Sequence, residues 1–184
     1  MQNSFRPLAA ALVALALVAG PAVAQTKFVG GAPMYPDRNI VENAVNSAAH
    51  TTLVAAVQAA GLVDALSGPG PFTVFAPVNA AFDALPAGTV DTLLMPENKS
   101  TLTKILTAHV ASGNWDFEAL KAKVDEAGGS FSFRTLSGDT LTTVSQNDRV
   151  YVVDENGGVA RITITDVNQS NGVIHVVNKV LLPK

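Results

Sequence analysis

The hydrophobic repeat of the chain changes near Gly129, and this change limits the folds that the chain can adopt. Before Gly129 the apolar residues recur mostly at the three- and four-residue spacing of helices, as in residues 102–110. After it, apolar and polar residues alternate as in strands, and Asn156-Gly157 is typical of a tight hairpin turn. One strand, residues 71–76, is predicted ahead of several helices. Helices followed by antiparallel strands favour an α+β fold over alternating βαβ units.

The first 24 residues have the layout of a secretory signal peptide. Arg6 precedes an unbroken run of small and apolar residues, 8–19, and Ala22-Val23-Ala24 offers small side chains at both positions that a signal peptidase recognises. A membrane anchor or a core helix is the alternative, but the run is too short for a permanent span. We therefore expect residues 1–24 to be removed, which leaves a secreted or periplasmic protein without a stable membrane anchor.

Removal of 24 of the 184 residues leaves 160, which fit one domain. Residues 25–38, with two glycines and two prolines, are predicted to be a short leader, and residues 39–184 to be the domain. The sequence has no cysteine, so it has no disulfide, no thiolate metal site and no cysteine nucleophile.

The charge pattern argues against a nucleic-acid partner. Cleavage would remove Arg6 and no acidic residue, which changes the formal net charge from −3 to −4. The remaining lysines and arginines are scattered and form no basic patch that could follow a phosphate backbone. We expect no nucleic-acid partner and no cofactor.

Three segments in order resemble the fasciclin domain: PFTVFAPVNAAFDAL (71–85), LTKILTAHVASG (102–113) and NGVIHVVNKVLLP (171–183). Together the resemblance covers residues 40–183. It implies a wedge-shaped antiparallel β-sandwich flanked by several short α-helices. It also implies a non-enzymatic extracellular interaction module of the cell-adhesion type.

The resemblance gives seven residues a structural part in the family's signatures: Pro77, Asn79, Phe82, His109, Gly172, His175 and Asn178. Three positions depart from the family's pattern. Ala108 stands where the family often has tyrosine, Asn178 where many relatives have aspartate, and Val167 where the family has the isoleucine of an Asp-Ile pair. We therefore do not assign to Ala108-His109 the adhesion that is attributed to the Tyr-His pair of animal relatives.

His109 shares a helical stripe with Leu102 and Ile105, and its neighbours at helical spacing include no other metal ligand. A core histidine bonded to backbone is favoured over a metal ligand, and the same holds for His175. Asn178 lies on the apolar face of the last strand and is predicted to be buried and hydrogen-bonded.

The segment from Asp166 to Gly172 is predicted to be an exposed polar loop between two strands. Asp166-Val167 matches an Asp-Ile pair that the family resemblance links to adhesion. The candidate partner-binding residues are therefore Asp166, Val167 and Asn168. The alternative is that Asp166 only bonds backbone within its own turn.

Enzymatic motifs are missing from the sequence. None of the serines lies in a G-x-S-x-G context, and the histidines lack HxxxH or HExxH spacing. Two function classes remain. The first is a module that binds cell-surface or extracellular protein or polysaccharide. The alternative is a small-molecule carrier, which would need a cavity between sheet and helices, walled by aromatic side chains that are few in this chain.

Intact mass spectrometry of the exported protein checks the cleavage prediction. Because small residues occupy both recognition positions, the mature chain should begin at Gln25. A mature chain that still carries the apolar run 8–19 would contradict it.

Overall fold

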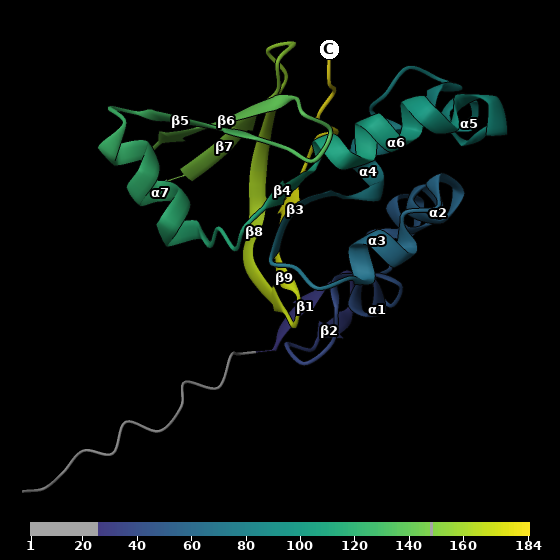
Figure 1. The fold of residues 1–184 in the computed structure, drawn as a ribbon, viewed down its shortest axis with the longest axis horizontal. Coiled ribbons are helices and arrows are strands. Elements are labelled where there is room, and N and C mark those ends of the chain that lie inside the picture. The colour runs from purple at the N-terminus through teal and green to yellow at the C-terminus, as the bar shows by residue number, and fades with distance from the viewer. Residues whose placement is uncertain (1–25, 148) are drawn as a thin grey trace, which may run out of the picture.

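The computed structural model describes residues 26–147 and 149–184, so the predicted signal peptide lies outside the described residues. Figure 1 shows a curled sheet with most helices on one side and one helix on the other. The helices are α1 (Ile40–Ala44), α2 (Thr51–Ala60), α3 (Val63–Ser67), α4 (Asn79–Asp83), α5 (Thr89–Leu94), η1 (Pro96–Asn98), α6 (Lys99–Ala108) and α7 (Phe117–Glu126). The strands are β1 (Lys27–Val29), β2 (Ala32–Met34), β3 (Phe72–Pro77), β4 (Val110–Ser112), β5 (Ser130–Arg134), β6 (Thr140–Gln146), β7 (Arg149–Val153), β8 (Val159–Gln169) and β9 (Gly172–Val177).

The large sheet has seven strands in the order β4-β3-β9-β8-β7-β6-β5. The α+β class with short helices is confirmed, whereas the antiparallel sandwich is not, because β3 and β9 pair in parallel. Two contacts join the edge strand β4 to the chain just after the other edge strand, β5. They are a β-bridge between Ala111 and Thr135 and a hydrogen bond from the Leu136 amide to the Val110 carbonyl. The sheet is therefore mixed and curls until it nearly closes into a barrel.

Local signals in the sequence explain three helix ends. Asn39 and Glu42 form a reciprocal capping box at the start of α1, and the Asp116 carboxylate accepts from the Ala119 amide at the start of α7. Gly61 ends α2 in the left-handed conformation, at φ +72°. Each of these ends therefore depends on residues that are close together in the sequence.

The segment 25–38 differs from the predicted leader. Residues 27–34 form the hairpin β1–β2, and its Val29 and Met34 side chains are buried in the same core cluster as Ile40. The glycines at 30 and 31 make the turn of this hairpin. The glycines and prolines of this segment, which are typical of linkers, led to the wrong prediction of a leader.

Strands β3 and β9 separate two hydrophobic clusters. Successive side chains of a strand point to opposite faces, and Val74 and Ala76 accordingly contact one cluster whereas Phe75 belongs to the other. The first cluster includes residues of α1, α3 and the hairpin β1–β2, and the second contains Leu120 of α7. Figure 1 shows α7 on the other side of the sheet from α1 and α3. Because both faces of β3 are covered, residues 73–77 are all buried.

The parallel pairing of β3 with β9 requires close backbone approach at Gly172. A Cβ on Gly172 would lie 2.0 Å from the Phe72 carbonyl oxygen, inside van der Waals contact. We expect Gly172→Ala to lower the free energy of unfolding by about 3 kcal/mol or more, since backbone must move.

The control is Gly138→Ala, at φ +89° with no atom within 4 Å of the added Cβ, where we expect a cost of about 1 to 2 kcal/mol. Urea unfolding of both variants measures the difference. Equal midpoints for the two variants would show that the approach at Gly172 carries no special constraint.

Candidate functional site

The structure places the three candidate partner-binding residues within strand β8, and the turn itself consists of Ser170 and Asn171. The expected exposed loop is therefore wrong. Val167 is 1% exposed and belongs to the core cluster of Val74, while Asp166 and Asn168 are half-buried. The strand is irregular here, with a register shift between Ile164 and Val167. Its residues therefore do not show the regular alternation of a strand, and the polar segment resembles a loop in the sequence.

Asp166 is used within the fold. Its backbone has φ +51°, the left-handed conformation that aspartate tolerates better than most residues. Its carboxylate accepts a 2.7 Å hydrogen bond from the Phe117 amide, at the start of α7. The Asp166 carboxylate therefore fastens the start of α7 to the sheet instead of bonding only within its own turn.

His175 is fully buried beside Asp166. Its Nε2 lies 2.7 Å from the Trp115 carbonyl, and its Nδ1 lies 3.4 Å from the Asp166 amide, which donates to it. The ring stacks on Phe75, with 5.7 Å between the ring centroids. Burial lowers the pKa of His175, so the neutral ring is a structural link between β9 and the segment before α7.

His109 is also a core histidine, 3% exposed. Its Nδ1 donates to the Ile105 carbonyl at 2.8 Å, and its Nε2 accepts from the Leu181 amide at 2.9 Å. Burial is the main cause that lowers the pKa of His109 to about 4. Both ring nitrogens have partners, which leaves neither free to bind a metal.

The signature at the end of β3 ties this strand to α2. The Asn79 side chain accepts from the Thr52 amide at 3.1 Å and donates to the Ala48 carbonyl at 2.9 Å. Pro77 ends β3, and Phe82 is buried in α4. These contacts hold α2 and α4 in place and present no reactive group.

Asn178 differs from its prediction in burial. The residue follows β9 and is exposed, because the strand ends at Val177. Its Oδ1 nevertheless accepts a 2.7 Å bond from the Arg161 amide, and its own amide donates to the Arg161 carbonyl. The amide group therefore extends the pairing of β8 with β9 from outside the core.

A polar groove lies where the turn between β8 and β9 meets the segment before β3. It encloses about 410 Å³ and is lined by Pro69, Gly70, Pro71, Asn114, Asn168, Gln169, Ser170, Asn171 and Gly172. The Asn171 side chain forms part of its frame, since it donates to the Leu66 and Gly68 carbonyls and accepts from the Ile40 amide. No local sequence pattern predicts this groove, because segments about a hundred residues apart build it.

Two amides of the groove remain available to a ligand. Within the part of the chain that the structure describes, the side chains of Asn114 and Asn168 hydrogen-bond to no other residue. Gln169, by contrast, accepts from Asn43 and donates to the Val167 carbonyl. The groove thus combines a fixed frame with free amide donors and acceptors.

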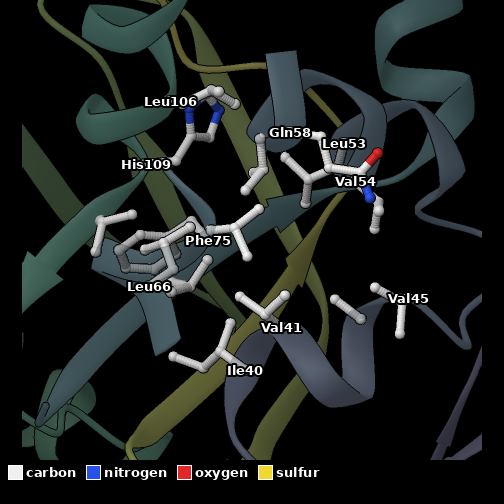
Figure 2. Close-up of a pocket in the computed structure, with 15 residues that line it drawn as sticks. Ile40, Val41, Val45, Leu53, Val54, Gln58, Leu66, Phe75, Leu106 and His109 are labelled. Atoms are coloured by element: carbon white, nitrogen blue, oxygen red, sulfur yellow. The ribbon is translucent and has the colours of Figure 1, made fainter. Parts of the chain in front are cut away.

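A second, apolar pocket of about 210 Å³ lies between β3 and the helices α1, α2 and α3. Figure 2 shows side chains from these elements converging on it. The carrier hypothesis predicted a cavity walled by aromatic side chains. Apart from Phe75 and the ring of His109, however, aliphatic side chains make up its apolar wall.

No group of three or more His, Asp or Glu side chains in residues 26–147 and 149–184 could hold a metal ion. Over those ranges, no helix is long and apolar enough to cross a membrane.

The profile of the Fasciclin domain family matches residues 48–183, which is well over half of the chain. The chain belongs to the fasciclin family. Protein sll1483 of Synechocystis sp. is 49% identical to this fasciclin chain over 144 residues, which cover 78% of this chain and 73% of that protein. Immunogenic protein MPB70 of Mycobacterium bovis is 33% identical over 195 residues, covering 95% of this chain and 92% of that protein.

Comparison of folds agrees with this assignment. A fasciclin domain pair from the insect cell adhesion molecule fasciclin I aligns with a TM-score of 0.70 at 18% identity, over 80% of this chain and 51% of that chain. The transforming growth factor-β-induced protein ig-h3 of Sus scrofa is 39% identical over 131 residues, 71% of this chain but 17% of that protein. Because the fasciclin I structure is only 18% identical in sequence, it supports the assignment of the fold alone.

Buried His109 makes the stability depend on pH. Its pKa is about 4 in the folded state and near 6.5 when unfolded, so between these values the unfolded chain binds a proton that the folded chain does not. Stability is therefore complete above pH 6.5 and falls as the pH drops toward 4. From pH 7 to pH 5 we expect this residue to lower the free energy of unfolding by about 2 kcal/mol.

Urea unfolding at the two pH values measures the effect, with His109→Gln as the comparison. The variant is less stable overall, but its loss between pH 7 and pH 5 should be smaller than that of the wild type. An identical loss in both proteins would show that His109 does not titrate as described.

Proposed function

We propose that this fasciclin protein is a secreted or periplasmic, non-enzymatic module that binds cell-surface or extracellular polymer through the polar groove at the β8–β9 turn. The observation that carries the proposal is the pair of free amide side chains, Asn114 and Asn168, on a frame fixed by Asn171. Family membership supports the class of function, since relatives include a cell surface glycolipoprotein, MPB83 of Mycobacterium bovis.

The chemistry of the groove favours polysaccharide over protein as the polymer. Amide and hydroxyl groups can pair with sugar hydroxyls, and the rings of Pro69 and Pro71 offer apolar contact beside them. The groove has no charged residue among those that line it, which favours a neutral polymer. Of the three candidate residues from the sequence, only Asn168 belongs to this proposal.

The frame lowers the entropic cost of binding. A Cβ on Gly70 would lie 1.9 Å from the Asn171 carbonyl oxygen, so the two segments meet at backbone contact. The Phe72 amide donates to the same carbonyl at 3.0 Å. A surface that is already fixed needs little ordering when a ligand binds.

Binding of polysaccharide from the source cell's envelope to the purified mature protein tests the proposal. The double variant Asn114→Ala, Asn168→Ala should bind about thirtyfold more weakly, since two hydrogen bonds of about 1 kcal/mol each are lost. Its free energy of unfolding should change by about 1 kcal/mol or less, because neither side chain bonds within the fold.

The matched control is Gln146→Ala, which removes an exposed amide on β6 outside the groove. It should bind as the wild type does. Equal binding by the double variant and the wild type would overturn the groove as the binding surface, and capture of envelope proteins alone would overturn the choice of polysaccharide.

A further inference from the structure

The apolar pocket offers space inside the fold. Residues of β3 line it together with Leu66 of α3 and side chains of α1 and α2. Figure 2 shows Phe75 and Leu66 close together, with Val41 of α1 and Val54 of α2 around the same space. Its volume of about 210 Å³ exceeds the roughly 150 Å³ of apolar cavities that stay dry and take up small apolar molecules. Hydrocarbon in this volume would regain the dispersion contacts that its lining lacks.

The walls offer almost no polar partner. Of the fifteen residues that line the pocket, Gln58 and His109 are the polar ones, and none is charged. Both nitrogens of His109 are bonded within the chain, and its lowered pKa keeps the ring neutral at pH 7. Gln58 is exposed on α2, so its amide lies on the solvent side of the lining.

Solvent can reach the pocket between α1 and α2. Val45, just after α1, is 52% exposed, and Val41 and Val54 on the facing helices are half-buried. These valines form an apolar rim with Gln58 beside it. A ligand can therefore place an apolar part inside and keep a polar end in water at the rim.

The occupant is a hydrocarbon chain and not a peptide. A peptide would bring amide and carbonyl groups that need partners once they leave water. Terminal amides of α1 and α2 already have partners in other parts of the chain, Asn171 for Ile40 and Asn79 for Thr52. Among the lining side chains only the amide of Gln58 could serve a peptide. An alkyl chain has no such requirement and gains free energy from burial of apolar surface.

We propose that this pocket binds the alkyl chain of a small neutral amphiphile, with a hydroxyl or other uncharged head group at the rim beside Gln58. The proposal goes beyond the polymer-binding function, because none of the fifteen lining residues belongs to the polar groove.

The probe is 1-octanol at micromolar concentration, added to the purified mature protein. Because it binds the folded state and not the unfolded chain, it should raise the melting temperature and should displace the neutral dye N-phenyl-1-naphthylamine. Octanoate should bind at least tenfold more weakly, since no cation lines the pocket to pair with its carboxylate.

Two variants fill the pocket from opposite sides, Val54→Phe on α2 and Val41→Phe on α1. Each should weaken binding of 1-octanol at least tenfold, and two positions guard against one variant failing to fold. The control is Val159→Phe, which makes the same change at an exposed valine of β8 and should leave binding unchanged.

Several results would overturn the proposal. These are an unchanged melting temperature of the wild type with 1-octanol, equal binding by wild type and both filling variants, or equal binding of octanoate. The test is independent of the polymer assay. The double variant Asn114→Ala, Asn168→Ala should still bind 1-octanol, and the Val54→Phe variant should still bind polysaccharide.

Discussion

The parallel pairing of β3 with β9 is the constraint on which the rest of the fold depends. It joins residues 72–77 to residues 172–177, across about a hundred residues of chain. On its outer sides β3 pairs with β4 and β9 pairs with β8, so the pair lies inside the large sheet. Because its two faces contact different hydrophobic clusters, loss of this pairing would expose both clusters at once.

The buried polar side chains are arranged around this pair. His175 of β9 links the sheet to the carbonyl of Trp115, and Asp166 of β8 fastens the start of α7. On the helical side, His109 receives the amide of Leu181 from the C-terminal segment. The two histidines, which are buried, bond backbone groups of segments distant in sequence.

Both proposed sites follow from the same pairing. The groove forms where the entrance to β3 meets the turn before β9, and its frame is the contact between Gly70 and Asn171. The apolar pocket forms between β3 and the helices α1, α2 and α3, whose side chains do not fill all of the space that they enclose. One site is therefore polar and at the end of the strands, and the other is apolar and on their face.

The sequence predicted what depends on near neighbours along the chain. Helical spacing in residues 102–110 located most of α6, and the alternation of apolar and polar residues after Gly129 located strands such as β5 to β7. The same spacing indicated that His109 faces the core. These features depend on contacts within a few residues, which a sequence displays directly.

Features that depend on distant segments could not be predicted in this way. The parallel register of β3 with β9 and the short strand β4 have no local pattern of their own. The positive φ at Asp166 and the end of β9 before Asn178 place those side chains differently from the expected alternation. The groove and the pocket are both built from segments that only the folded chain brings together.

Native-state hydrogen exchange of the mature protein tests the central role of the β3–β9 pair most directly. The account predicts that the backbone amides of Val74, Phe75, Ile174 and Val176 exchange only through global unfolding, with opening free energies equal to that from urea unfolding. If these amides instead exchange through smaller local openings while β5 to β7 remain protected, the pair is not the element on which the fold depends.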